Sequence, residues 1–311
     1  MLALHWLCAA ALIAALCAAL WRASHPGAST SRARAVLARY VTHPAAVVAL
    51  VALIVLYVVS LLAPWLATHD PIEILAQALV HHPPSRTLLF GTDFAGRDVF
   101  SRVLYGTRIS LTIALLATAI SVVVGTAYGA TAGFVGGSLD TILMRVVDAF
   151  LSIPRIVLLI AIGTLWSPLS ITSLILILGL TAWFGTSRLV RAEVLSLKER
   201  EMVAAARALG ARDLAIVCRH VLPNVLSPVI VAATLGVAGV IVNEAALSYL
   251  GIGIPDPIPS LGNIIHDGTP YIATAWWVAL FPGIVLVITA LACNLAGDGL
   301  RDAMDPRQVD R

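Results

Sequence analysis

Long apolar runs alternate with short polar stretches along most of the 311-residue chain. A helix that crosses a bilayer needs about twenty predominantly apolar residues, and seven stretches approach that length. They cover residues 2–21, 45–67, 109–133, 144–166, 171–190, 225–247 and 276–296. The pattern predicts an all-α polytopic membrane protein, in which the fourth span is the weakest because charged residues and Pro154 interrupt it.

Composition supports the same class of protein. Only 12% of the residues are charged, about half the share found in soluble domains, so the chain cannot present an ordinary soluble exterior. The mean hydropathy is +0.94. The 4 cysteines have no metal-ligand spacing, which argues against a zinc site and against a disulfide framework.

The first apolar run, residues 2–21, has two interpretations. A signal peptide carries basic residues before its apolar core, whereas here the first basic residue, Arg22, follows the core. We therefore expect an extra amino-terminal span with its amino terminus outside. A basic cytoplasmic linker would follow it as far as residue 43.

Basic residues are distributed unevenly between the two sides that alternating spans define. If residues 22–43 are cytoplasmic, most of the 20 Lys and Arg residues fall on that side. Such a bias marks the cytoplasmic side, so it also predicts a cytoplasmic carboxyl terminus. Two long loops, residues 68–108 and 248–275, are expected outside.

The stretch MVAAARALGARDLAIVCRHVLPN, residues 202–224, is basic and too polar to be a span. Gly210 stands where a glycine ends a helix, Asp213 suits the start of a second helix, and Pro223 is expected to end it. The expected apolar positions of the two helices are Met202, Val203, Ala206 and Leu209, then Leu214, Val217, Cys218 and Val221. The residues alone leave two roles open: a loop on anionic lipid headgroups, or a hairpin held by a partner.

This stretch resembles the cytoplasmic loop of ATP-binding-cassette (ABC) importer permeases. That loop reads Glu-Ala-Ala, three residues, Gly, nine residues, Ile, one residue, Leu-Pro. The positions that match with the spacing intact are Ala205, Ala206, Gly210, Leu222 and Pro223. The chain departs from the pattern at Ala204, where Glu is usual, and at His220, where Ile is usual.

Four further segments resemble one branch of these permeases. GTDFAGRDVFSRVLYGTRISL, LDTILMRVVDAFLSIP, EAALSYLGIGIPDPIPSLGNII and GDGLRDAMDP are similar to the dipeptide, oligopeptide and nickel permease family, in its second permease type. The resemblance covers about residues 40–308. It implies a six-helix type I importer core over residues 44–311. The expected amino-terminal span, residues 2–21, lies outside what the family pattern needs.

The resemblance also implies partners. A homologous second permease would complete a pore for short peptides, two cytoplasmic ABC ATPases would grip the hairpin at residues 192–224, and an external binding protein would deliver the solute. ATP and Mg would bind to the ATPases, because this chain has no G-x-x-x-x-G-K-[ST] loop and no cofactor site of its own. We expect a transport subunit of the bacterial inner membrane, not an enzyme, with membrane lipid and no nucleic acid as a partner.

Three ionisable residues lie near membrane depth: Asp148, Arg155 and Glu244. Such residues face a bundle interior or a cavity. Asp148 and Arg155 are seven residues apart and would share a helix face, either in structural pairing, with Arg145 as another partner for Asp148, or along the solute path. Glu244 is expected to satisfy polar groups of the irregular outer loop, with gating of the pore as the alternative.

Other readings of the outer loops and of the function stay open. His69, His81 and His82 would suit nickel, although peptides are preferred because loop histidines are usually solvated. Asp98 and Arg102 are spaced i, i+4 and would stabilise an exposed or interfacial helix. The alternatives are an importer of nickel or another small solute, a secondary transporter without an ATPase, and a membrane subunit that transports nothing.

Overall fold

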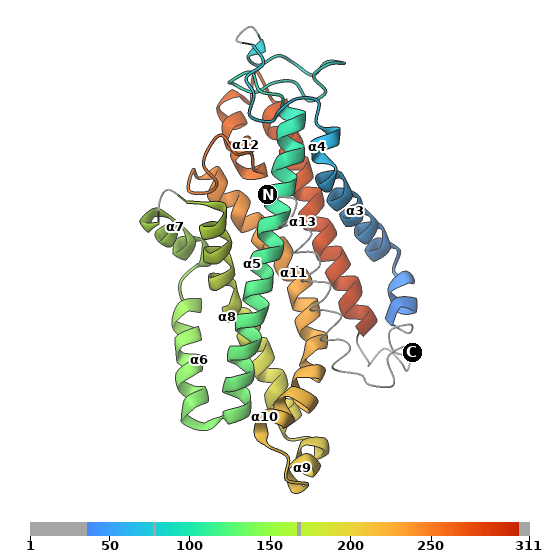
Figure 1. Cartoon of the computed structure of the whole chain (residues 1–311), viewed down its shortest axis with the longest axis vertical. Helices are drawn as coiled ribbons and strands as arrows, with labels where there is room; N and C mark the ends of the chain where they lie inside the picture. The colour runs from blue at the N-terminus through green and yellow to red at the C-terminus, as the bar shows by residue number, and fades with distance from the viewer. Residues whose placement is uncertain (1–35, 77–78, 167–168, 305–311) are drawn as a thin grey trace.

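The computed structural model describes residues 36–76, 79–166 and 169–304. These ranges form a helical bundle without a named strand, with a single isolated β-bridge between Thr92 and Asp98. The longer helices run along the long axis of the molecule (Figure 1). The α-helices are α3 (Pro44–Leu61), α4 (Ala63–Leu66), α5 (Val99–Val135), α6 (Gly137–Leu151), α7 (Arg155–Leu165), α8 (Ile171–Lys198), α9 (Glu201–Ala208), α10 (Asp213–Ile216), α11 (Leu222–Tyr249), α12 (Leu261–Gly268) and α13 (Trp277–Met304), with a π-helical turn η2 (Val217–Val221) and a 3₁₀ turn η3 (Thr269–Tyr271).

Five helical stretches in the described part of the chain are long and apolar enough to cross a membrane: α3, α5, α8, α13, and the run from α10 through α11. A sixth crossing is formed if the bent pair α6 and α7 counts as one span. The prediction of an all-α polytopic protein with a six-span core is therefore confirmed. The predicted first span, residues 2–21, lies outside the described residues.

The fourth predicted span, residues 144–166, is wrong as a continuous helix. The chain turns by 84° between α6 and α7. Pro154 explains the break, because its ring disfavours a helical conformation at Ile153 and it has no N–H to donate. The helix before the break begins at Gly137 and so lies partly outside the predicted range.

The outer loop predicted at residues 68–108 is shorter than expected, because α5 begins at Val99. Asp98 caps the helix: its carboxylate accepts a hydrogen bond from the Ser101 amide at 3.0 Å. The first turns of α5 carry the buried arginines Arg102 and Arg108. Because these residues are charged, the apolar pattern alone does not show that the helix begins before residue 109.

Close packing between α5 and α8 forms the largest helix–helix interface of the bundle. Glycines on both helices allow it. A Cβ atom added to Gly125 would lie 2.7 Å from the Thr186 side chain, and one added to Gly179 would lie 2.9 Å from the Ala117 carbonyl oxygen. At Gly129 an added Cβ would overlap a backbone carbonyl of α8. These two helices therefore form the rigid frame from which the other elements extend.

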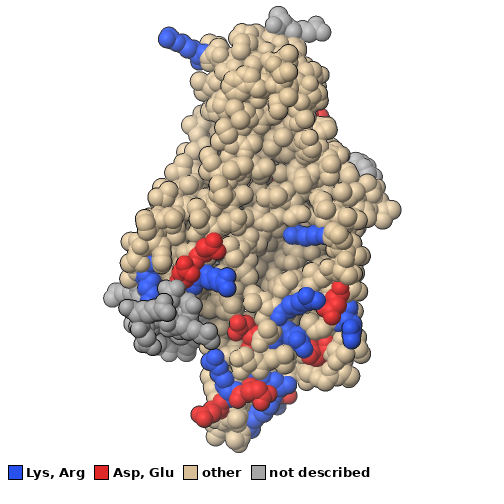
Figure 2. Space-filling view, turned by 180° about the vertical axis from the view of Figure 1, so that it is seen from behind, with Lys and Arg blue, Asp and Glu red and all other residues tan. Residues whose placement is uncertain are grey.

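The two ends of the bundle differ in chemistry. The loop before α5 lies with α12 at one end, and α9 and α10 project at the other (Figure 1). Charged side chains gather at the end that carries the projection, below a belt that is almost free of them (Figure 2). Large apolar side chains of α3 and α13 are exposed along this belt, as lipid-facing helices require.

Candidate coupling hairpin and solute pathway

The turn after α9 has the geometry that a helix-ending glycine provides. Gly210 has a φ of +79°, in the left-handed region that favours glycine. Its N–H donates to the Arg207 carbonyl at 2.9 Å, and the Ala211 N–H donates to the Ala206 carbonyl at 3.1 Å. These two bonds define a Schellman motif, which satisfies the last carbonyls of the helix. The hairpin therefore reverses tightly at Gly210, as the sequence predicts.

The second arm of the hairpin differs from the prediction. Helix α10 starts at Asp213 as expected, but the chain continues through η2 directly into α11. Pro223 lies in the first turn of α11 and does not end a helix. A π turn widens the helix by one residue, which accommodates a proline ring that would press on the carbonyl four residues before it. The second arm is thus rigidly connected to a membrane span.

The hairpin is seated on the bundle by a small apolar cluster. Val203, Ile216 and Val221 are fully buried and pack with Val190 and Val194 of α8. Four of the predicted apolar positions do not take part, because they are exposed: Met202, Leu209, Leu214 and Cys218. Helical spacing shows which residues share a face, but the face that turns inward is set by packing on α8.

The tip of the hairpin presents exposed apolar groups. Leu209 is 88% exposed and Leu214 is 75% exposed, on either side of Gly210. Ala205 is exposed as well, whereas Ala206 is buried and Leu222 and Pro223 are partly buried. Two exposed leucines beside a tight turn form a small apolar surface that water does not favour, which is suited to a complementary groove.

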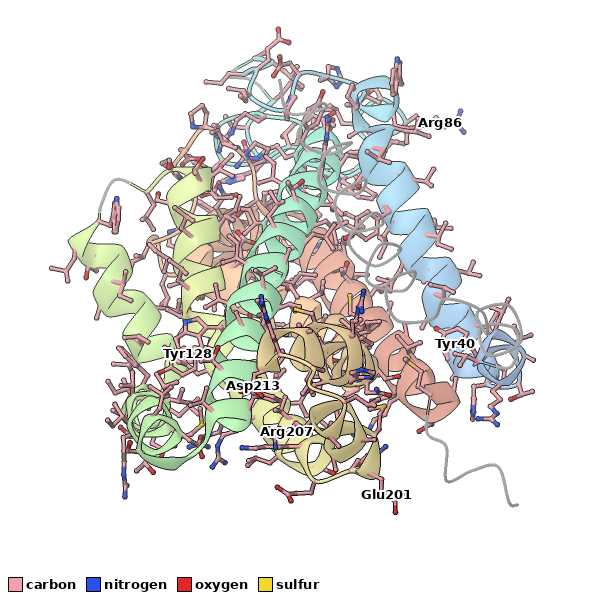
Figure 3. The ribbon with its side chains drawn as sticks, turned by 60° about the horizontal axis from the view of Figure 1, so that its bottom comes forward. Tyr40, Arg86, Tyr128, Glu201, Arg207 and Asp213 are labelled. Carbon is pink, nitrogen blue, oxygen red and sulfur yellow. The ribbon has the colours of Figure 1, made fainter. Side chains whose placement is uncertain are left out.

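Charged side chains connect the hairpin to the end of α5. The Arg207 guanidinium lies 5.6 Å from the centre of the Phe134 ring and its Nε is 3.8 Å from an Asp213 carboxylate oxygen. Lys198 Nζ donates to the Phe134 carbonyl at 2.7 Å. Figure 3 shows Arg207 and Asp213 on the projecting hairpin, with Glu201 directed away from the bundle. A force on the hairpin would thus reach α5, α8 and α11 together.

The candidate pathway residues are placed differently from each other. Asp148 pairs with Arg188 of α8, with both side chains about half exposed. Arg155 lies beyond the bend and donates through Nη2 to the Leu178 carbonyl at 3.3 Å. The expectation that Asp148 and Arg155 share a helix face is wrong, because the break at Pro154 separates them. Among the described residues, the ion-pair partner of Asp148 is Arg188 and not Arg145.

Glu244 is fully buried in α11. Its carboxylate accepts from the Ser110 hydroxyl at 2.7 Å and from the Ser248 hydroxyl at 2.8 Å. The contact with Ser110 ties α11 to α5. Both expected roles of Glu244, satisfying the outer loop and gating the pore, stay predictions.

Comparison with known proteins adds the family. Residues 125–310 match the family described as binding-protein-dependent transport system inner membrane component. The chain belongs to this family. Residues 31–84 also match the N-terminal TM domain of oligopeptide transport permease C. The resemblance found in the sequence motifs is thus confirmed, and the chain is a transport permease, a class that is not enzymatic.

Several relatives of the permease are similar over most of its length. It is 43% identical over 269 residues to a putative peptide transport system permease protein of Brucella abortus, covering 86% of this chain and 90% of that protein. It is 38% identical over 258 residues to the dipeptide transport system permease protein DppC of Bacillus subtilis, covering 82% and 79%. It is 35% identical over 269 residues to the oligopeptide transport system permease protein OppC of the same species, covering 86% and 88%.

A solved structure has the same fold. A chain of the MetNI methionine ABC transporter in an inward-facing conformation aligns with a TM-score of 0.54 and 23% identity, covering 66% of the permease and 96% of that chain. This likeness confirms the importer permease architecture of the helical core.

The end of the bundle opposite the hairpin holds a cluster that sequence reasoning missed. Arg102 is fully buried, 3.1 Å from Asp93 and 3.1 Å from Asp267. Arg97 lies 2.7 Å from Asp93 and 3.4 Å from Asp267. The predicted pairing of Arg102 with Asp98 is wrong, and so is the exposed setting expected for it. The cluster joins the loop before α5 to α12, which lies far away in the sequence.

The Asp267 carboxyl of this cluster is electrostatically perturbed. Burial raises the pKa of Asp267 above its ordinary value, while Arg102 acts in the opposite direction and Asp256 adds to the rise. The sequence carried a signal for part of this cluster, since Asp93, Arg97 and Arg102 recur within ten residues of one motif. Nothing local indicated that Asp267 would join them.

The outer histidines do not gather. His69 Nδ1 is 3.7 Å from an Asp98 carboxylate oxygen, His81 packs on the Tyr271 ring at 4.3 Å, and His82 Nδ1 lies 2.9 Å from the Pro83 carbonyl oxygen. Within the ranges that the structure describes, no group of three His, Cys, Asp or Glu residues is placed to hold a metal ion.

Proposed function

We propose that this permease forms half of the pore of an ATP-driven importer for short peptides. A homologous second permease completes the pore, an extracytoplasmic binding protein delivers the peptide, and two cytoplasmic ATPases drive the cycle. The names of the relatives support the peptide substrate, since they are described as peptide, dipeptide and oligopeptide transport permeases. The family description supports the binding protein and the inner membrane.

The observation that carries the proposal is the projecting hairpin at residues 201–224. Its tip exposes two leucines to water while its base is packed on α8 and is continuous with α11. Such a tip is suited to an ATPase groove, with Ala205, Ala206, Gly210, Leu222 and Pro223 as the coupling residues. This placement makes the charged end cytoplasmic, and with it the carboxyl terminus. ATP and Mg then bind to the ATPases, with no cofactor in the permease.

The experiment compares the uptake of two solutes and tests whether peptide uptake depends on the ATPases. Cells that lack the permease should lose the uptake of a labelled tripeptide and keep the uptake of Ni²⁺, and the reintroduced gene should restore peptide uptake. Peptide uptake should also stop when the phosphate-loop lysine of the ATPases is replaced. Retained peptide uptake with lost Ni²⁺ uptake would favour the nickel alternative. Uptake that survives the ATPase substitution would favour a secondary transporter.

A further inference from the structure

A cavity of about 110 Å³ lies where α5, α7, α8 and α11 meet, near the middle of the bundle. Its wall on α11 includes Gly236 and Gly239, which contribute no side chain. A Cβ atom added to Gly239 would meet nothing within 4 Å, so this wall is open. The polar residues that line the cavity are Thr118, Ser121, Arg155 and Thr186.

The Thr118 hydroxyl has no hydrogen-bond partner in the described structure. The residue is only 7% exposed. Thr107, Thr112 and Thr181 each donate at 2.7 Å to the carbonyl four residues earlier, which satisfies the hydroxyl within the helix. The Thr126 hydroxyl of the same helix also lacks a partner, but Thr126 does not line the cavity. Because a buried hydroxyl without a partner is costly, the free hydroxyl of Thr118 points to a ligand in the cavity.

Arg155 supplies a positive charge to the same cavity. It is the first residue of α7, so the bend at Pro154 positions it. Its Nε is buried without a partner, and its single described hydrogen bond goes to the Leu178 carbonyl. Among the described residues no carboxylate lies within 4 Å of the guanidinium. A cation at membrane depth normally has a counter-charge, and the described part of the chain provides none for Arg155.

We propose that this cavity is a subsite on the solute path that binds the terminal carboxylate of the transported peptide. The inference rests on the proposed peptide substrate. An arginine fork binds a carboxylate through two parallel N–H···O bonds, and the Thr118 hydroxyl adds a neutral donor. The open wall of α11 leaves room for the residue that bears the carboxylate. The charge of Arg155, the unpaired Thr118 hydroxyl and the space beside the α11 glycines thus all suit a peptide carboxylate.

The test uses the complete transporter, with both permeases, the ATPases and the binding protein, in proteoliposomes. The substrates are trialanine with a free carboxylate and trialanine amide. Arg155→Gln should lower the uptake of the free acid by about tenfold to a hundredfold, since a hydrogen bond to a charged group is lost. Uptake of the amide, relative to the wild type, should fall much less than that of the free acid, because the amide carries no negative charge for the guanidinium to pair with. Arg155→Lys should restore part of the free-acid uptake, and the exposed Arg145→Gln is the matched control.

A second readout separates binding in the cavity from a structural role. ATP hydrolysis stimulated by the loaded binding protein should persist in Arg155→Gln, so that fewer peptides are delivered for each ATP. Thr118→Val keeps the shape of the side chain and should lower free-acid uptake by about tenfold or more in a fully assembled complex, because one hydrogen bond to the charged carboxylate is lost.

Three outcomes would overturn the subsite. They are unchanged free-acid uptake in Arg155→Gln, an equal fall for both peptides, and a loss that follows disassembly of the two permeases while Thr118→Val transports normally. The last result would assign Arg155 to an acidic residue of the second permease. If the wild-type transporter itself takes up neither peptide, the proposed function fails instead.

Discussion

Gly210 offers a direct way to ask whether the hairpin tip contacts a partner. Its φ of +79° places it in the left-handed region, where a side chain costs about 1–2 kcal/mol for most residues. A Cβ atom built there meets nothing within 4 Å. Replacing Gly210 by alanine therefore adds backbone strain but no clash with the described residues, and a further loss in larger residues indicates a surface that encloses the tip.

A series of four substitutions separates the two contributions. Gly210→Ala measures the strain alone. A strain of about 1 kcal/mol corresponds to a roughly fivefold lower occupancy of the hairpin conformation. Gly210→Asn should lose less, because asparagine tolerates the left-handed region. Gly210→Glu and Gly210→Gln carry the same strain as alanine in this open space. If an ATPase groove encloses the tip, both should fall far below alanine, and the difference between them reports the effect of charge.

The assay is the recovery of ATPase subunits with the purified permease, alongside peptide uptake in the same membranes. We expect the order Gly, Asn, Ala, then Gln and Glu, with insertion of the permease unchanged because the spans do not depend on this turn. The binding protein should still dock at the other end. Equal values for Gly210→Glu and Gly210→Ala would refute the reasoning, and would favour a hairpin that lies on lipid headgroups.

Three further predictions concern stability, each measured by thermal unfolding of the purified permease complex. Gly129→Ala should destabilise the interface of α5 and α8 by about 1–3 kcal/mol through overpacking, whereas Gly185→Ala, which meets nothing within 4 Å, should not. Arg102→Gln should cost up to about 3–5 kcal/mol, because Asp93 and Asp267 then share Arg97 alone as their buried cation. Arg86→Gln in the exposed loop should cost little, and equal effects would contradict the cluster. Glu244→Gln should cost about 1–3 kcal/mol, because the carboxylate accepts from Ser110 through one oxygen and from Ser248 through the other, and the NH2 group of an amide cannot accept. An unchanged unfolding midpoint would show that these hydrogen bonds do not stabilise the bundle.

Much of the bundle was predictable because the bilayer imposes a length on every apolar run. Within the described residues, the helices α3, α5, α8, α11 and α13 contain or closely match the predicted spans. The turn of the hairpin was predictable for a different reason. A left-handed residue favours glycine strongly enough that one letter indicates the conformation, and Gly210 adopts it.

Features that depend on partners far away in the sequence were not predictable. The start of α5, before the predicted apolar run, is stabilised by Asp267, which lies 165 residues after Arg102. Spacing along the helix suggested Asp98 as the partner of Arg102, but Asp98 is used instead to cap the helix. The i, i+4 spacing pointed to Asp98, whereas Arg102 lies beside Asp93 and Asp267 in the folded chain.

The fourth span shows how a single break redistributes function. With a straight helix, Asp148 and Arg155 would lie on one face, two turns apart. The turn at Pro154 instead leaves Asp148 to pair with Arg188 and carries Arg155 to the cavity without a counter-charge. The sequence shows the proline and both charges, but not which neighbour each charge meets, since that depends on the angle of the bend. The candidate subsite is therefore a property of the bent span rather than of a motif, and a variant that straightens the bend should remove it even with Arg155 in place.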